Sequence, residues 1–176
     1  MSIELKIKAA IRDVPDFPKA GIMFKDITPV FLYPDLRKEI TKAFCEKFSN
    51  IEVDVIVGVE SRGFLFGMLM AEYMGVPFVP IRKKGKLPAE TFGIEYDLEY
   101  GQASIEIHKD AIKPNQKVLL HDDLLATGGT IVAAAELIKL TGAELVGFSF
   151  LVSLDFLNGR EKLNKYSDNI VTLANY

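Results

Sequence analysis

Apolar runs of strand length alternate along the chain with longer stretches in which apolar residues recur at helical spacing. Apolar runs predict strands at 53–59, 76–81, 104–108, 118–120, 145–154 and 169–173. Helical spacing predicts helices at 2–12, 35–48, 64–74 and from the turn at 126–130 up to residue 141. Strands that alternate with helices indicate an α/β fold, an open, mainly parallel, twisted sheet flanked by helices. Ligands bind such sheets at the carboxyl ends of the strands.

The stretch 118–142 carries the clearest chemical signal in the chain. Two adjacent carboxylates, Asp122 and Asp123, follow the apolar run, and a turn of small and hydroxyl residues precedes the helix. That turn consists of Ala126, Thr127, Gly128, Gly129 and Thr130. Its glycines let backbone N–H groups face an anion, and the helix N-terminus adds unpaired donors and a positive dipole end. Carboxylates suit sugar hydroxyls or a metal ion, so the stretch predicts a ribose 5-phosphate site.

Other phosphate-binding loops fit this stretch less well. No lysine precedes the threonine as a Walker loop requires, and the dinucleotide pattern G-x-G-x-x-G is absent. The remaining alternative is an ordinary strand-to-helix turn that uses glycine for geometry and threonine as a cap. The acidic pair in front of the turn argues against that alternative.

A second unit of strand, polar turn and helix carries a cation. The sequence Glu60-Ser61-Arg62-Gly63 joins the predicted strand at 53–59 to the predicted helix at 64–74. A basic run at 82–86 follows the next strand. Taken alone, each is compatible with a solvated surface turn, although a helix N-terminus favours anions. The stretch 87–102 has no convincing period and is long for a compact domain, which predicts a functional segment.

The composition is typical of one globular domain spanning residues 1–176. The chain is 49% hydrophobic and has a net charge of −3, which argues against a dedicated nucleic-acid binder. The apolar stretch 64–74 is too short to span a bilayer, and the first ten residues lack the apolar core of a signal peptide. The single cysteine, Cys45, excludes an internal disulfide. We therefore expect a cytoplasmic protein without a membrane or nucleic-acid partner.

The string Asp-Asp-Leu-Leu-Ala-Thr-Gly-Gly-Thr at 122–130 resembles the phosphoribosyl pyrophosphate motif of the type I phosphoribosyltransferases, most closely that of the adenine phosphoribosyltransferases. The strings Gly-Ile-Met-Phe-Lys-Asp-Ile at 21–27 and Leu-Glu-Tyr-Gly at 98–101 extend the resemblance over nearly the whole chain. The resemblance implies purine salvage, in which adenine and phosphoribosyl pyrophosphate give AMP and pyrophosphate. It also implies a base-side segment at 14–34 and a mobile hood at 87–102.

The resemblance further implies how the nucleotide is held. Asp122 and Asp123 would face the ribose 2- and 3-hydroxyls, and the turn at 126–130 would hold the 5-phosphate. Phe24 would stack on the purine, while backbone groups of neighbouring residues, Met23 and Lys25 among them, would read the edge of the base. The family usually has arginine where this chain has Lys25, and lysine cannot form the same planar fork.

Roles in the chemical step are also implied by the resemblance. The pyrophosphate would be bound by Ser61, Arg62, Arg82, Lys83 and Lys86, with one basic residue able to come from a neighbouring subunit. Glu99 would handle a proton at a purine ring nitrogen. Tyr100 would pack or hydrogen-bond beside the ribose or the pyrophosphate. His108 and His121 are expected to be structural rather than catalytic.

The implied cofactor is Mg²⁺, held mainly by substrate and water without a direct protein ligand. The implied partners are adenine, phosphoribosyl pyrophosphate, AMP and a second copy of the chain in a homodimer. One alternative is a phosphoribosyltransferase for a 6-oxopurine or orotate, which the intact string at 124–130 disfavours. The other is a regulator that senses phosphoribosyl pyrophosphate without catalysis, which the intact acidic pair and the lack of a basic excess disfavour.

Overall fold

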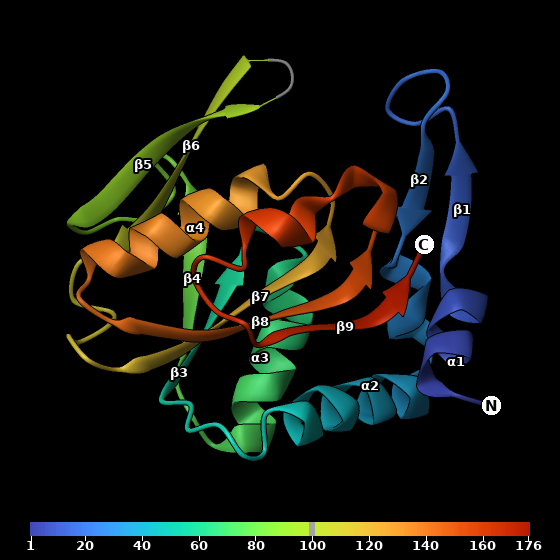
Figure 1. Ribbon diagram of the computed structural model, residues 1–176, viewed down its shortest axis with the longest axis horizontal. Coiled ribbons are helices and arrows are strands. Elements are labelled where there is room, and N and C mark those ends of the chain that lie inside the picture. The colour runs from blue at the N-terminus through green and yellow to red at the C-terminus, as the bar shows by residue number, and fades with distance from the viewer. Residues whose placement is uncertain (99–100) are drawn as a thin grey trace.

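The computed structural model describes residues 1–98 and 101–176, and within them a seven-stranded sheet forms the centre of the molecule (Figure 1). The strand order is β5-β6-β4-β3-β7-β8-β9. The strands are β3 (Val55–Val59), β4 (Phe78–Lys83), β5 (Thr91–Leu98), β6 (Gly101–His108), β7 (Lys117–Leu125), β8 (Glu144–Ser153) and β9 (Ile170–Asn175). Strands β4, β3, β7, β8 and β9 run parallel, and β6 and β5 add an antiparallel hairpin at one edge.

Helices cover both faces of the sheet and bury an apolar core on each. On one face lie α1 (Ile3–Ala10), α2 (Pro34–Lys47) and α3 (Gly63–Met74), whose buried residues join one core cluster. On the other face, α4 (Gly129–Leu140) packs against the sheet and joins the second cluster. This arrangement confirms the predicted open, mainly parallel α/β fold. Strand β3 is buried along its whole length, as expected for a continuous apolar run with helices on both sides.

The boundaries of the predicted elements follow from local backbone chemistry. Helix α3 ends at Gly75, whose φ of 68° is the left-handed conformation that favours glycine. Helix α2 begins at Pro34 rather than after it, because proline is well suited to the first helical position, where its missing N–H costs nothing. Pro80 in β4 faces no ladder partner toward β6, since that pairing begins only at Arg82.

The expectation that 87–102 lacks regular structure is wrong for its described part. Strand β5 lies within this stretch and pairs with β6 along its whole length. Phe92, Ile94 and Tyr96 alternate along β5 and pack against the core cluster that contains α4. That period of two is the signal of a half-buried strand, and the intervening glycine and charged residues obscure it in the sequence.

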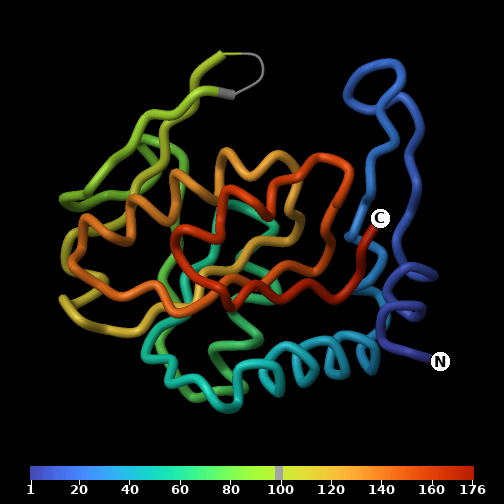
Figure 2. The backbone as a smooth tube through the Cα atoms, viewed as in Figure 1, coloured from blue at the N-terminus to red at the C-terminus, as the bar shows by residue number. Residues whose placement is uncertain are grey.

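Two hairpins project from the same side of the molecule at opposite ends (Figures 1 and 2). One is the β5–β6 hairpin. The other is a separate two-stranded sheet formed by β1 (Arg12–Pro15) and β2 (Met23–Asp26). The proline-rich segment 14–34 is not one regular element, because it continues from β2 into the short 3₁₀ helix η1 (Thr28–Leu32). Among the described residues, no helix is long and apolar enough to cross a membrane.

Candidate active site

A cavity of about 740 Å³ opens at the carboxyl ends of the parallel strands. It is lined from the β1–β2 side by Met23, Phe24 and Lys25, from the start of α3 by Arg62, and from β7 by Asp122. The whole turn at 126–130 lines it as well. The structure therefore brings the predicted base-side residues together with Asp122 and the predicted phosphate turn, although they lie about a hundred positions apart in the chain. Asp123, the other predicted ribose residue, is not among the described residues that line the cavity.

The turn at 126–130 is shaped for an anion by its glycines and by the helix that follows. Gly128 has a φ of 82°, and a Cβ there would lie 3.0 Å from the carbonyl oxygen of Gly159. At Gly129, by contrast, a Cβ would find its nearest neighbour, the Asp97 carbonyl oxygen, at 3.9 Å, which is an ordinary van der Waals contact. Helix α4 begins at Gly129 without a side-chain cap, which leaves its first N–H groups for a ligand. The turn can therefore bind a phosphate through backbone donors.

Two polar side chains outside the predicted set brace this turn. The Lys162 ammonium donates to the Thr127 carbonyl oxygen at 2.7 Å, and Lys162 lines the cavity. The Tyr96 hydroxyl donates to Thr130 Oγ1 at 3.2 Å, and its neighbour Asp97 also lines the cavity. Lys162 lies in the 3₁₀ helix η3 (Gly159–Lys162), which follows η2 (Asp155–Leu157). No local sequence motif indicates a role for Lys162. For Tyr96, the alternation of apolar residues along β5 could have indicated that its side chain faces the core and α4.

The acidic pair lies within β7 rather than after it, so its two side chains leave the strand in opposite directions. Asp123 is 5% exposed, and the Arg62 guanidinium donates from Nε to its Oδ2 at 2.5 Å. Asp122 lines the cavity, and its Oδ1 accepts from the Asp123 N–H at 2.8 Å. Burial, followed by the charge of Asp123, raises the pKa of Asp122 well above its ordinary value. The pair thus combines an anchored carboxylate with one that retains its proton more readily.

On the base side, Phe24 presents an aromatic ring to the cavity. Phe17 packs edge-on against it at 5.0 Å between centroids, and the Arg62 guanidinium carbon lies 5.4 Å from its ring centre. The Lys25 ammonium makes different contacts. It donates to Asp13 at 2.7 Å and lies 4.0 Å from the centre of the Tyr176 ring. The charge at position 25 therefore fixes the β1–β2 hairpin to the end of the chain.

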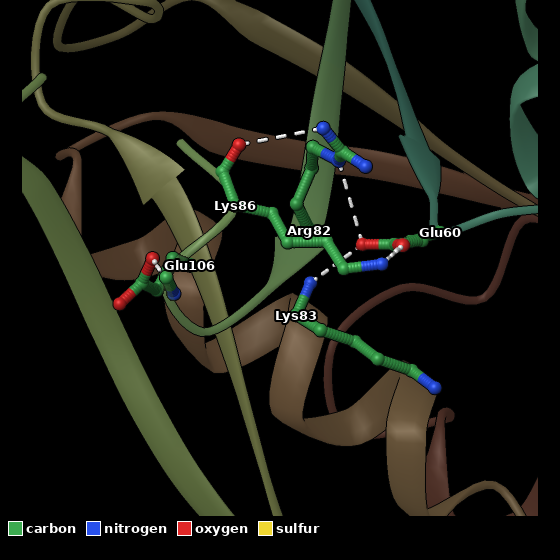
Figure 3. Close-up of polar contacts among 6 residues, drawn as sticks. Glu60, Arg82, Lys83, Lys86 and Glu106 are labelled. Carbon is green, nitrogen blue, oxygen red and sulfur yellow. Dashed lines mark hydrogen bonds and ion pairs between the residues drawn. The ribbon is translucent and has the colours of Figure 1, made fainter. Parts of the chain in front are cut away.

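The predicted pyrophosphate residues divide into two groups. Arg62 lines the cavity, next to Ser61 in the turn between β3 and α3. A Cβ at Gly63 would lie 2.9 Å from the carbonyl oxygen of His121, so this turn lies tightly against β7. The other group is the basic turn 82–86, which comprises the last two residues of β4 and the three that follow. It carries Arg82, Lys83 and Lys86 and contacts Glu60 (Figure 3). Among the described residues that line the cavity, none comes from this basic turn.

The two predicted catalytic residues, Glu99 and Tyr100, lie outside the described residues. Glu95, which also precedes a tyrosine in the stretch 87–102, is described, and its side chain is 67% exposed and paired with Lys84 at 3.2 Å. His121 is fully buried, with Nδ1 at 2.9 Å from Ser149 Oγ. Burial lowers its pKa to about 3, so the imidazole is neutral at pH 7, which suits a structural role.

No group of three or more His, Cys, Asp or Glu side chains within residues 1–98 and 101–176 could hold a metal ion. Among the described residues that line the cavity, Asp97 and Asp122 carry carboxylates, and Asp122 adjoins the turn at 126–130 through β7. This donor set fits a Mg²⁺ ion that takes most of its oxygen ligands from a bound phosphate compound and water, as Mg²⁺ commonly does.

Comparison with known proteins places the chain in a family. The model of the phosphoribosyl transferase domain matches residues 32–174. The adenine phosphoribosyltransferase of Cytophaga hutchinsonii is 48% identical over 99% of this chain and 96% of its own length. That of Francisella philomiragia is 52% identical over 97% of each chain.

Solved structures give the same result. The adenine phosphoribosyltransferase of Thermoanaerobacter pseudethanolicus has a TM-score of 0.94 at 48% identity and covers 98% of this chain and 99% of its own. The Saccharomyces cerevisiae enzyme, complexed with an iminoaltritol bisphosphate and adenine, has a TM-score of 0.91 at 44% identity, with 97% and 98% covered. On the strength of these matches and of the phosphate turn and acidic pair described above, the chain belongs to the phosphoribosyl transferase family, among the adenine phosphoribosyltransferases.

Proposed function

We propose that this protein transfers the phosphoribosyl group of phosphoribosyl pyrophosphate to adenine, giving AMP and pyrophosphate in purine salvage. The observation that carries the proposal is that one cavity is lined by Phe24, by Asp122 and by the glycine turn at 126–130. A purine, a ribose and a phosphate need these three kinds of partner. The relative in Trypanosoma brucei, 26% identical, was solved with AMP, pyrophosphate and ribose-5-phosphate.

The nucleotide half of the substrate would be held by the turn and the acidic pair. Backbone N–H groups of Ala126, Thr127, Gly128, Gly129 and Thr130, with the two threonine hydroxyls, would bind the 5-phosphate. Asp122 and Asp123 would accept hydrogen bonds from the ribose hydroxyls. The negative charge of Asp123 would also favour the positive charge that develops on the ribose ring as the bond to pyrophosphate breaks.

The base would lie against the β1–β2 hairpin. Phe24 would stack on adenine, and backbone groups of Met23 and Lys25 would read the edge of the base, because the Lys25 ammonium is already engaged by Asp13 and Tyr176. Ser61 and Arg62 would bind the pyrophosphate through the turn before α3, with Arg82, Lys83 and Lys86 adding charge from the basic turn. Positioning and electrostatics would then supply most of the rate enhancement.

When bound, Mg²⁺ would supply positive charge to the diphosphate leaving group and help to orient it. We also propose that the stretch 87–102 acts as a hood, in which Glu99 handles a proton at a purine ring nitrogen and Tyr100 lies beside the ribose or pyrophosphate. A hood would exclude water, which competes with adenine for the activated ribose. The buried free thiol of Cys45 suits a reducing compartment, and we extend the proposal to a cytoplasmic location.

The proposed substrate predicts strong selection for adenine over hypoxanthine and orotate. Hydrogen-bonding groups that do not match at purine position 6 leave buried partners unpaired, which can cost about 10⁴-fold in kcat/KM. The measurement is pyrophosphate release with each base in turn, with and without Mg²⁺, and mass identification of the nucleotide product. Equal rates with adenine and hypoxanthine would favour a phosphoribosyltransferase for another base. Binding of phosphoribosyl pyrophosphate without turnover on any base would favour a regulator.

We further propose a homodimer that forms through the outer face of α3. This helix is apolar on nearly every side, yet Leu65, Met68 and Tyr73 are 42%, 52% and 57% exposed. A helix that is apolar all round is normally buried, so a second copy is a suitable cover for this face.

The homodimer predicts a sedimenting mass of twice the 19.6 kDa chain, which Met68→Asp should reduce to that of one chain. A buried aspartate without a partner would oppose association. The matched control is Leu140→Asp, which introduces the same charge at an equally exposed apolar position of α4, 53% exposed, and should leave the dimer intact. A wild-type monomer, or a dimer that survives Met68→Asp, would rule out this interface.

A further inference from the structure

Glu60 has contacts that the roles described so far do not explain. It is the residue between the end of β3 and Ser61, and its side chain is 9% exposed. Its Oε1 lies 2.8 Å from the Lys86 ammonium. Its Oε2 accepts from the Lys83 backbone N–H at 2.8 Å and lies 3.4 Å from Arg82 Nε (Figure 3). One nearly buried carboxylate thus contacts three residues of the basic turn.

Arg82 and Lys86 have few other contacts that could fix their charges, whereas Lys84 of the same turn pairs with Glu95 at 3.2 Å. The Arg82 guanidinium donates from Nη1 to the Lys86 carbonyl oxygen at 3.3 Å, which closes the turn on itself. The Gly85 N–H donates to Glu106 at 3.0 Å, and this bond holds the backbone of the turn without touching a cation (Figure 3). The Arg82 guanidinium and the Lys86 ammonium both contact Glu60, and these two cations would repel each other without its carboxylate. Glu60 is therefore the group that sets where the two side-chain charges lie.

The Glu60 carboxylate is negatively charged at every pH at which the protein would be assayed. Burial raises its pKa, but hydrogen bonds from Lys86 and the Lys83 N–H, together with the nearby Arg82 guanidinium, outweigh burial and bring the pKa down to about 2. One negative charge facing two positive ones leaves a positive surplus. The Lys83 side chain extends away from Glu60 and adds to that surplus (Figure 3). The turn therefore retains an attraction for a polyanion while its cations are held in place.

We propose that Glu60 is a positioning residue that fixes Arg82 and Lys86 beside the Ser61–Arg62 turn, so that both segments present their charge to the diphosphate. The inference rests on the proposed function. Its basis is that the carboxylate belongs to the segment after β3, whereas its partners lie at the carboxyl end of β4 and in the residues that follow it. The two strands are parallel neighbours, so their carboxyl ends meet at one edge. Glu60 joins the two segments there. It would affect the reaction only by holding Arg82 and Lys86 in place, without contacting the substrate itself.

The test is Glu60→Gln, which keeps the shape of the side chain and removes its charge. We expect the KM for phosphoribosyl pyrophosphate, and for pyrophosphate in the reverse reaction, to rise about ten- to a hundredfold. The adenine KM should stay at the wild-type value, and kcat should change by no more than about threefold on the same free-energy scale. Glu106→Gln is the matched control. It removes the charge of a carboxylate that accepts from a backbone N–H, that of Gly85 in the same turn, and it should leave all these constants near wild type.

Several outcomes would overturn the proposal. An unchanged pyrophosphate KM would show that Glu60 does not position the cations, and a lower KM would show that it competes with the diphosphate for them. An equal rise in the Glu106→Gln variant or in the adenine KM would indicate a general loss of structure. If thermal melting shows that Glu60→Gln is unfolded, Glu60→Asp takes its place, because its shorter side chain moves the charge away from the cations. The expected result is the same: a higher KM for phosphoribosyl pyrophosphate and pyrophosphate, with the adenine KM and kcat nearly unchanged. A wild-type protein that makes no AMP would refute the proposed function instead, while calorimetric titration of pyrophosphate into the same variants would still test Glu60.

Discussion

Replacing Asp123 by asparagine should lower kcat/KM by orders of magnitude while the protein remains folded. Asp123 holds the Arg62 guanidinium at 2.5 Å, and the proposed mechanism uses its charge at the ribose. A lost charge-assisted hydrogen bond costs roughly 1.5–3 kcal/mol, and the loss of a charge opposite the developing positive ring adds to that cost. The measurement is the steady-state rate of AMP formation, with thermal melting to establish that the variant is folded.

Asp122→Asn should have a smaller effect than Asp123→Asn. The pKa of Asp122 is raised, so this side chain carries more of its protonated form at a given pH, and asparagine resembles that form in shape and charge. Asp155→Asn is a suitable control, because Asp155 lies after β8 at the same sheet edge, its carboxylate accepts from the Ser153 hydroxyl at 2.6 Å, and the proposed mechanism gives it no contact with the ribose. If Asp122→Asn and Asp123→Asn both retained wild-type activity and affinity, the ribose role of the pair would be wrong.

Glu99→Gln should lower kcat by about a hundredfold to ten-thousandfold, the usual cost of losing a positioned proton-transfer group. The affinity for phosphoribosyl pyrophosphate should change little, because the proposed contact is with the base. The chain provides a matched control in Glu95, which precedes a tyrosine just as Glu99 does. Glu95 is exposed and paired with Lys84, so Glu95→Gln should remain within a few-fold of wild type.

Single-turnover rates of the two glutamine variants would separate chemistry from product release. The opposite ranking, with Glu95→Gln strongly impaired and Glu99→Gln active, would move the catalytic carboxylate to position 95. It would also mean that the ion pair between Glu95 and Lys84 opens when substrate binds.

The parts of the fold that could be predicted from sequence are those in which local signals agree. In 118–142 the apolar run, the glycine turn and the alanine-rich stretch all indicate strand, turn and helix, and the structure has β7, the turn and α4 there. Strand β5 was missed because its apolar positions are separated by glycine and charged residues. Its place in the sheet depends on pairing with β6 and on packing against α4, neither of which is a local property.

The candidate site shows the same division between local and long-range information. Motifs indicated Phe24, Asp122 and the turn, and the cavity includes all of them. Sequence could not indicate that Lys162 braces the turn, because that contact joins positions 35 residues apart. It also could not indicate that Glu60 holds the basic turn, since the pairing of β3 with β4 creates that contact.

The central claim is that one cavity holds the phosphate at the 126–130 turn and the base at Phe24. A crystal structure of this protein with AMP tests it most directly. We expect the 5-phosphate within hydrogen-bond distance of the backbone N–H groups of that turn, the ribose hydroxyls toward Asp122 and Asp123, and adenine stacked on the Phe24 ring. A phosphate bound anywhere outside residues 126–130, or a base that leaves Phe24 uncovered, would contradict the claim.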